Sequence, residues 1–330
     1  RWPDQILDSG WKFGTHLVYM KDLVDYWQHQ YDWRTHERIL NRLNHYRVQL
    51  DDITLHFIHQ PGVGPDPMPL LISHGWPGSI YEFVNIFAPL TDPGSFGGDP
   101  QDAFSVVAPS LPGYGFSLVP DQRRLGVEEI AELFMRLMTE VLGYSRFAAQ
   151  GGDWGSFITA RLGLAYPKQV AGIHLNMLPV APHPSQRSDL TAAETKFLKE
   201  ADIFLKEESG YQWIQGTKPQ TLSYALNDSP VGLAAWIVEK FYTWTDCHGD
   251  LESRIGKNTM LTNIMIYWIT QTINSSFWLY YEMRHNPWRL GRDERINVPV
   301  AMAAFPGEIL RPPKEWVQRI CNLQRWTQMP

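Results

Sequence analysis

The segment Gly151-Gly152-Asp153-Trp154-Gly155 limits the folds open to this chain of 330 residues more than any other stretch. An apolar, strand-like run (147–149) leads into it, and a helix-like run (156–162) leads out. Small residues on both sides of a central residue allow the sharp strand-to-helix turn of a nucleophile elbow. The central side chain here is a carboxylate, which attacks saturated carbon and leaves an ester for water to cleave. On the pentapeptide alone, a helix-capping role for Asp153 stays equally open.

A second loop lies about eighty residues upstream. The strand-like run 69–73 enters His74-Gly75-Trp76-Pro77-Gly78-Ser79, a turn rich in glycine and proline. In an α/β-hydrolase this loop supplies one backbone N–H of the oxyanion hole, and the residue after the nucleophile supplies the other. We therefore expect the donors to be Trp76 and Trp154. His74, Gly75 and Pro77 are expected to support the loop, with no proton transfer by His74.

With both loops identified, the chain resembles an epoxide hydrolase of the microsomal type. The resemblance also rests on residues 112–117, 208–211, 228–235 and 305–308, and it covers nearly the whole chain. It implies an α/β-hydrolase fold with a mostly parallel sheet, helices on both faces, a helical cap insertion and an N-terminal segment that wraps around the catalytic domain. No cofactor and no metal are expected.

Strand and helix patterns agree with that fold. Strands are predicted at 69–73, 104–108, 145–150, 170–175 and 298–304, alternating with helical stretches, which is typical of a mostly parallel sheet. Residues 20–27 predict an amphipathic helix, and residues 49–59 predict two strands around an acidic turn. His56 and His59 alternate there with apolar residues, which favours edge or solvent-facing positions. The predicted division is 1–66 for the N-terminal epoxide-hydrolase segment and first strands, 67–180 for the first part of the core, 181–265 for the cap and 266–330 for the second part of the core.

The amino-acid composition limits the classes of binding partner that this chain can have. A net charge of −6 provides no basic surface for nucleic acid or an anionic membrane. No apolar run approaches the roughly 18 residues of a membrane span. Cys247 and Cys321 are far apart and read as reduced thiols of a cytoplasmic protein, and Cys247-His248 is a weak metal candidate. The 14 tryptophans suit an aromatic pocket under a lid. The expected partner is a small hydrophobic epoxide; a homodimer is left open.

Opening an epoxide requires an acid for the developing alkoxide, and a phenol that stays protonated at neutral pH can serve. The family's motifs place two such phenols at Tyr211 and Tyr280, and the neighbouring Tyr281 could be confused with Tyr280. Ester hydrolysis requires a base and a carboxylate that orients it. Glu308 follows the strand-like run 298–304 on a Pro-Gly loop and is the expected carboxylate.

The histidine base should follow Glu308 in the chain, yet no histidine occurs after His285. The resemblance places it in a Gly-Gly-His segment beyond Pro330, after a strand formed by 323–329. We therefore expect a chain that is incomplete at both ends, with an upstream anchor left open because it begins at Arg1. Such a chain should open an epoxide, become alkylated at Asp153 and stall. The alternative is that another histidine is recruited as the base, but none lies on a suitable loop.

Two other functions stay open on the sequence. A haloalkane dehalogenase shares the aspartate elbow followed by tryptophan and the His-Gly-x-Pro loop, but it would need halide donors where an epoxide hydrolase needs phenols. A binding protein that has lost turnover would keep the pocket and lack the histidine.

Overall fold

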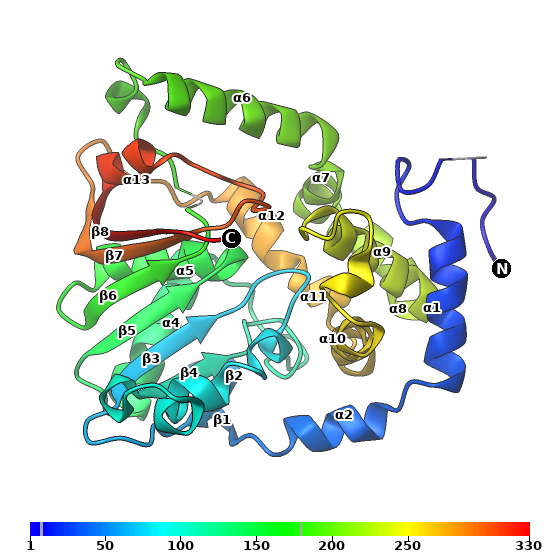
Figure 1. Ribbon diagram of the computed structural model, residues 1–330, viewed down its shortest axis with the longest axis horizontal. Coiled ribbons are helices and arrows are strands. Elements are labelled where there is room, and N and C mark those ends of the chain that lie inside the picture. Colours follow the sequence, from blue (N-terminus) through cyan, green and yellow to red (C-terminus); the bar gives the residue numbers. More distant parts are fainter. Residues whose placement is uncertain (7–8, 179) are drawn as a thin grey trace.

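A single eight-stranded sheet organises the computed structural model, which describes residues 1–6, 9–178 and 180–330 (Figure 1). The strand order is β1-β2-β4-β3-β5-β6-β7-β8. The pairs β1–β2 and β2–β4 are antiparallel and the other pairs are parallel. The strands are β1 His45–Leu50, β2 Ile53–Gln60, β3 Met68–Ser73, β4 Phe104–Pro109, β5 Phe147–Gly151, β6 Val170–Leu175, β7 Ile296–Ala304 and β8 Cys321–Gln328. The mostly parallel sheet was predicted from the alternation of strands and helices.

Alternate residues of the central strands pack on opposite faces of the sheet, as the pleat requires. Leu71 and Val107 belong to the large apolar core, whereas Leu70 and Val106 belong to a smaller cluster on the other side. The helices that contribute to the large core include α4 (Val127–Arg136) and α5 (Asp153–Ala165), and those on the other side are η1 (Ile80–Phe83) and α3 (Phe87–Thr91). Both faces of the sheet are therefore covered.

Between β6 and β7 the chain leaves the sheet and builds a helical layer beside it (Figure 1). The helices are α6 Ala192–Glu207, α7 Gly210–Thr217, α8 Pro219–Asp228, α9 Pro230–Thr243, α10 Lys257–Thr270, α11 Ile273–Ser276 and α12 Trp278–His285. An end of the cap at residue 265 would fall inside α10. This helix buries Met260, Leu261 and Tyr267 on several sides, so no change in its sequence pattern marks a boundary. The division into domains stays a prediction.

The N-terminal segment encloses the helical layer and then joins the sheet. Helices α1 (Leu17–His29) and α2 (Trp33–Leu40) contact this layer, α1 through α9 and α10, and α2 through α10. Trp11 stacks on Tyr242 of α9 with ring centroids 4.0 Å apart. The predicted helix 20–27 lies within α1, and the predicted hairpin is β1–β2. The described part of the segment thus runs along the cap side and joins one edge of the sheet through β1 and β2 (Figure 1).

The prediction of an exposed His56 is wrong. This side chain is 4% exposed, and its Nδ1 and Nε2 lie 2.9 Å from Ser110 Oγ and 2.8 Å from His45 Nδ1. Strand β2 is not an edge strand, because β1 pairs with one side of it and β4 with the other. The ring of Phe116 also packs against the His56 ring. Burial lowers the pKa of His56 to about 3, so the ring is neutral at physiological pH.

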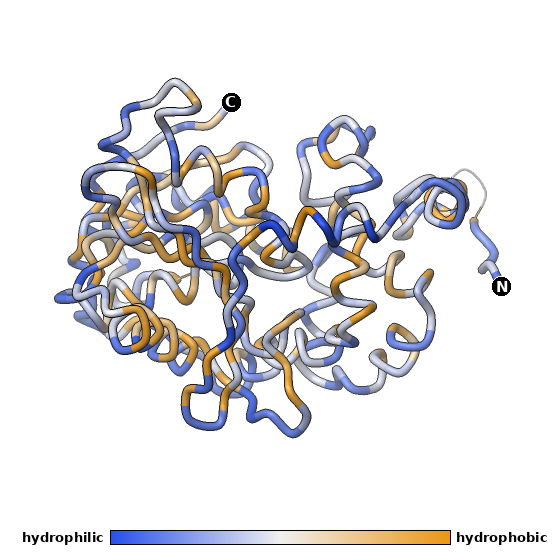
Figure 2. The backbone as a smooth tube through the Cα atoms, turned by 90° about the horizontal axis from the view of Figure 1, so that it is seen from below, coloured by the Kyte–Doolittle hydropathy of each residue, from blue (hydrophilic) through white to orange (hydrophobic). Residues whose placement is uncertain are grey.

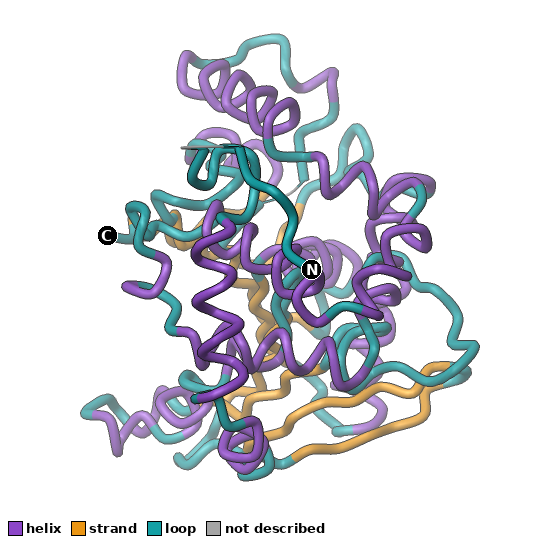
Figure 3. The backbone as a smooth tube through the Cα atoms, turned by 90° about the vertical axis from the view of Figure 1, so that its right-hand side faces the viewer, coloured by secondary structure: helices purple, strands orange, loops and turns teal. Residues whose placement is uncertain are grey.

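The remaining short helices are η2 Pro93–Phe96, η3 Pro100–Asp102, the π-helix η4 Leu137–Val141, η5 Pro184–Gln186, η6 Leu251–Ser253 and α13 Lys314–Ile320. Hydrophilic residues dominate many of the outward loops (Figure 2), and the strands form one twisted layer bordered by helices (Figure 3). None of the helices in the described part of the chain combines the length and the apolar character that a membrane crossing requires.

Candidate active site

The predicted elbow joins β5 to α5, and its geometry depends on glycine. The backbone of Asp153 has a φ angle of 45°, which lies in the left-handed region that residues with a Cβ rarely adopt. A Cβ on Gly151 would lie 2.1 Å from the Gly155 carbonyl oxygen, and one on Gly155 would lie 2.0 Å from the Ser73 carbonyl oxygen. Strand, turn and helix can approach this closely only because both residues are glycines.

The carboxylate of Asp153 is held from another loop. The Trp76 N–H donates to its Oδ1 at 2.8 Å, and the Trp154 N–H also donates to this carboxylate. Gly152 is the N-cap residue of α5, so capping does not account for Asp153. Desolvation raises the pKa of Asp153 to about 6, against the opposite effect of the two amides. The group is therefore largely ionised at neutral pH, and it is accessible from the pocket.

His74 and Gly75 shape the loop that carries Trp76. The buried His74 donates from Nδ1 to the Gly75 carbonyl oxygen at 3.1 Å and accepts the Leu111 N–H at Nε2, also at 3.1 Å. Burial lowers the pKa of His74 to about 4, which keeps the ring neutral as this arrangement requires. A Cβ on Gly75 would lie 2.1 Å from Asp153 Oδ1. Both ring nitrogens of His74 are occupied, so it is not free to accept a proton from water.

Helix α10 ties down the other end of this loop. The peptide bond between Trp76 and Pro77 is cis. The Pro77 carbonyl accepts a hydrogen bond from Asn263 Nδ2 at 2.7 Å, and the Gly78 carbonyl accepts one from the Tyr267 hydroxyl at 2.6 Å. The core loop and the helical layer are thus joined directly beside the nucleophile.

Tyr211 on α7 and Tyr280 on α12 approach the nucleophile from the cap side. Their ring centroids are 5.7 Å apart and both side chains are buried. The Tyr211 ring stacks on the Trp76 indole at 5.4 Å, and the Tyr280 ring meets the Trp154 indole edge-on at 4.7 Å. Burial, with the charge of Asp153 contributing, raises the pKa of both phenols above the usual value, so they stay protonated.

Tyr281 is separate from this pair. Its ring stacks on His285, and the Arg124 guanidinium lies over it at 5.5 Å. Tyr281 does not line the pocket that contains Asp153, whereas Tyr280 does. Of the two neighbouring tyrosines, Tyr280 is therefore the one that lies beside the nucleophile, and its catalytic role stays a prediction.

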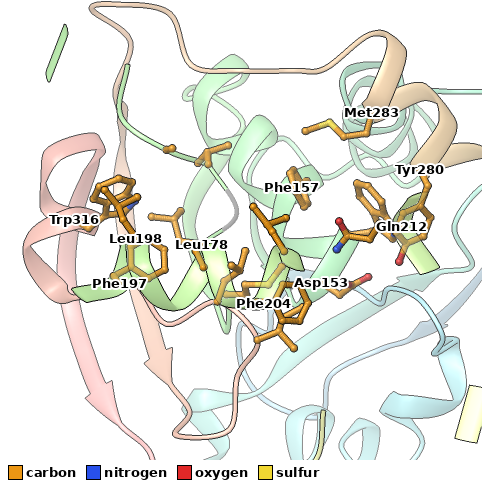
Figure 4. A pocket seen from close by; sticks show the side chains of 18 of the residues that line it. Asp153, Phe157, Leu178, Phe197, Leu198, Phe204, Gln212, Tyr280, Met283 and Trp316 are labelled. Atoms are coloured by element: carbon orange, nitrogen blue, oxygen red, sulfur yellow. The ribbon is translucent and has the colours of Figure 1, made fainter. Parts of the chain in front are cut away.

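A pocket of about 510 Å³ connects the nucleophile with the cap. Asp153, Gln212 and Tyr280 lie toward one end of it, and Phe197, Leu198 and Trp316 toward the other (Figure 4). Most of its surface is apolar. The lining side chains come from α5, from the residues after β6, from α6 and α7, from α12 and from the loop and helix after β7.

Glu308 lies on the loop after β7 and lines a neighbouring cavity of about 330 Å³, which Glu208 and Trp244 also line. The Ile309 N–H donates to Glu308 Oε1 at 2.8 Å. Desolvation raises the pKa of Glu308 to about 7, and the charge of Asp153 adds to the rise against the Ile309 amide. Glu308 is thus close enough to sense the nucleophile, although it does not line the same pocket.

Sequence reasoning missed three polar residues near this site. Gln212 Nε2 donates to the Tyr211 hydroxyl oxygen at 2.9 Å. Lys240 lies over the Tyr211 ring, with Nζ 4.9 Å from its centroid. Glu82 lies against Gly78, where a Cβ would be 1.4 Å from its Oε1. The residue as a whole is exposed, but desolvation of its carboxyl group and then the charge of Asp153 raise its pKa to about 8. Only Lys240 carried a sequence signal, because it and Glu239 are two adjacent charges in the otherwise mostly apolar run 231–242.

No group of three or more His, Cys, Asp or Glu side chains in the described part of the chain is arranged to hold a metal ion. Cys247 and Cys321 are free and buried.

Comparison with known proteins identifies the family. Residues 1–83 match the family model described as epoxide hydrolase N terminus, and residues 68–212 match that of the alpha/beta hydrolase fold. A putative epoxide hydrolase of Stigmatella aurantiaca (strain DW4/3-1) is 43% identical over 319 residues, covering 97% of this chain and 72% of the relative. The chain belongs to the epoxide hydrolase family. The predicted family, fold and enzyme class are thereby confirmed, and the haloalkane dehalogenase alternative is not supported.

Other members of the epoxide hydrolase family give the same result. Epoxide hydrolase 1 of Oryctolagus cuniculus is 39% identical over 338 residues, covering 94% of this chain and 74% of the relative. The crystal structure of juvenile hormone epoxide hydrolase from the silkworm Bombyx mori superimposes with a TM-score of 0.87 at 29% identity, covering all of this chain and 83% of that one. The similarity extends over the N-terminal segment, the sheet and the helical layer.

Proposed function

We propose that Asp153 opens an epoxide by attack on a ring carbon and that water then releases a vicinal diol. One observation carries this proposal. A carboxylate at a strand-to-helix elbow accepts hydrogen bonds from main-chain amides, and two buried phenols lie opposite it across an apolar pocket. Membership of the epoxide hydrolase family supports the same reaction.

In the first half-reaction an Asp153 carboxylate oxygen forms a bond to the epoxide carbon. The ring C–O bond breaks, and its electron pair moves to the epoxide oxygen. A bare alkoxide would be very unfavourable in an apolar pocket. Tyr211 and Tyr280 are the proposed acids: they donate hydrogen bonds to this oxygen and one of them transfers a proton, which gives a hydroxyalkyl ester of Asp153. Their raised pKa values support this role, since the protons are retained at neutral pH.

In the second half-reaction water attacks the ester carbonyl carbon, and the negative charge moves to the carbonyl oxygen. The Trp76 and Trp154 N–H groups are the proposed donors to that oxygen, because they already donate to the free carboxylate. Collapse of this intermediate releases the diol and restores Asp153 with one oxygen from water. Glu308 is the proposed partner of the histidine base that the resemblance places after Pro330.

The pocket supports a hydrophobic substrate. Its volume of about 510 Å³ and its mostly apolar lining suit an epoxide with a lipophilic substituent, placed with its ring between Asp153 and the two phenols. The net charge of −6 supports the expectation that nucleic acid is not a partner.

A cytoplasmic location and a homodimer belong to the proposal as well. Two buried free thiols are consistent with a reducing compartment. Light scattering coupled to size-exclusion chromatography would test the dimer, since a mass near 38.1 kDa for this chain would contradict it.

Intact-protein mass spectrometry after incubation with excess styrene oxide tests the reaction. This polypeptide should gain one substrate mass and release little diol, because no histidine is among the described residues that line the pocket with Asp153. Asp153→Asn should prevent the adduct. Steady multiple-turnover formation of diol would mean that another residue acts as the base. The absence of both adduct and diol in the folded protein would contradict the proposed function.

A further inference from the structure

Lys240 is a buried cation beside the cap tyrosines. It lies on α9 and is 7% exposed. Lysine is rarely buried to this extent without a partner, because an ammonium ion loses hydration there. Its Nζ lies 2.5 Å from Glu239 Oε2, and its charge also lowers the pKa of Glu208 against the stronger effect of burial. The two carboxylates are ionic partners of Lys240, but they do not explain why a lysine is placed here.

The aromatic neighbours of Lys240 suggest the reason. Its Nζ lies 4.9 Å from the centroid of the Tyr211 ring and 5.4 Å from that of Trp244. Both distances fall within the range of a cation–π interaction. The Tyr211 ring also stacks on the Trp76 indole with an interplanar angle of 10°. Lys240 therefore contacts one of the two proposed acids directly, through the π face of its ring.

We propose that Lys240 is a positioning residue for epoxide opening, which holds the Tyr211 ring and stabilises the negative charge that develops on its phenol oxygen. The inference rests on the proposed function, because it assumes that Tyr211 donates to the epoxide oxygen. It assigns Lys240 no contact with the substrate.

Lys240 acts on the transition state of ring opening. As Tyr211 shifts its proton toward the epoxide oxygen, electron density rises on the phenol oxygen and in the ring. A cation over the ring face attracts this density more strongly than it attracts the neutral phenol, so the interaction lowers the barrier. Gln212 Nε2 acts in the same direction, because it donates to the Tyr211 oxygen and leaves the hydroxyl proton available. The charge of Glu239 opposes them, because it adds to the desolvation that raises the pKa of Tyr211, whereas the low-dielectric surroundings strengthen the effects of Lys240 and Gln212.

The first test compares alkylation rates of Asp153 by styrene oxide, followed by intact-protein mass spectrometry. Lys240→Met retains much of the side-chain volume and removes the charge, so alkylation should slow about tenfold. Lys240→Arg should stay within about threefold of the parent rate, since arginine also binds aromatic faces. Lys257→Met is the matched control: Lys257 lies 5.3 Å over the Tyr26 ring and pairs with Asp22, away from the pocket, so its loss should leave the rate unchanged.

A double variant separates positioning from general packing. In a Tyr211→Phe background the ring remains and the hydroxyl is gone, so Lys240→Met should cause no further slowing. Equal slowing in both backgrounds would assign Lys240 to packing and overturn the inference, as would an unchanged rate in Lys240→Met alone. If Lys240→Met does not fold, the variant Glu239→Gln/Lys240→Met removes both charges of the ion pair. Its alkylation rate is then measured in the same way, with and without Tyr211→Phe. If the parent chain forms no adduct, the proposed function is contradicted. If the adduct forms at the same rate with and without the Lys240 charge, only this inference is contradicted.

Discussion

The two halves of the candidate site are held in place by different means. On the core side, the main chain fixes the nucleophile. Asp153 itself has a left-handed backbone conformation, Gly151 and Gly155 allow close main-chain contacts, and the amides of Trp76 and Trp154 donate to the carboxylate. On the cap side, side-chain packing positions the acids, through the stacking of Tyr211 on Trp76 and the edge contact of Tyr280 with Trp154. The core half should therefore be sensitive to single added atoms, and the cap half to the loss of particular polar groups.

The difference follows from what each half does. The nucleophile and the oxyanion donors must meet within hydrogen-bond distance, and main-chain geometry provides that without loss of side-chain entropy. The acids must approach substrates of varied shape from a helical layer, and aromatic packing can place a phenol without a fixed backbone turn. Each half can be perturbed while the other is kept.

The largest effect is expected from removal of the nucleophile. Asp153→Asn keeps the shape of the side chain and most of its hydrogen bonds but removes the negative charge. The alkylation rate should fall on the order of 10⁴-fold or more, as for other essential nucleophiles. Single-turnover hydrolysis in heavy-oxygen water by a histidine-complete version offers a complementary test. The label should stay in the Asp153 carboxylate, and label in the first diol would contradict the ester intermediate.

Loss of both cap phenols should come next. Tyr211→Phe/Tyr280→Phe keeps the rings and removes the two hydroxyl groups. Alkylation of Asp153 should slow by about 10²- to 10³-fold, the range known for loss of an oxyanion donor, and each single variant should be milder. Hydrolysis of a preformed ester in a histidine-complete chain should change little, because the Trp76 and Trp154 amides remain. Full activity in the double variant would exclude these residues as the acids.

A single methyl group should disturb the core half without touching the cap. A Cβ on Gly75 would lie 2.1 Å from Asp153 Oδ1, so Gly75→Ala must displace the carboxylate while the surrounding main chain is kept. A displacement of about 1 Å can slow a reaction about a hundredfold. Gly256→Ala is the control, because no heavy atom lies within 4 Å of a Cβ there, and it should react at the parent rate. A Gly75→Ala variant as fast as Gly256→Ala would mean that the main chain does not fix the nucleophile.

The core half was predictable because its constraints are local in sequence. The elbow pattern around Asp153 and the His74–Ser79 loop each specify a turn through their glycines, and strand alternation indicated the sheet that brings them together. Assignment of the oxyanion donors to Trp76 and Trp154 needed only the order of the two loops. The roles themselves stay predictions until they are measured.

The cap half depended on resemblance, because its residues meet through tertiary packing. Nothing local distinguishes Tyr280 from Tyr281, and only their neighbours in space do so. The predicted end of the cap at residue 265 falls within α10 and stays a prediction. His56 was expected at an edge or solvent-facing position because the pairing of β2 with β4 could not be inferred. Lys240 was missed for the same reason, because its proposed role depends on contact with the ring of Tyr211, 29 positions earlier in the chain.

The smallest expected effect is that of pH on the rate of alkylation, and it distinguishes the core half of the site from the cap half. Because the pKa of Asp153 is raised to about 6, the reactive carboxylate is lost as the pH falls through 6, and the rate at pH 5 should be about tenfold below the plateau. The phenols keep their protons over this range, since their pKa values are raised. Initial alkylation rates from pH 5 to 8, with folding monitored by circular dichroism at each pH, should follow one ionisation near 6. Tyr211→Phe/Tyr280→Phe should be slower with nearly the same midpoint, because removing the hydroxyl groups leaves the two main-chain amides around Asp153 in place. Desolvation raises the pKa of Glu308 to about 7. A midpoint near 7 would therefore mean that Glu308, on the loop after β7, controls ring opening, and it would contradict the assignment of the nucleophile to the core half alone.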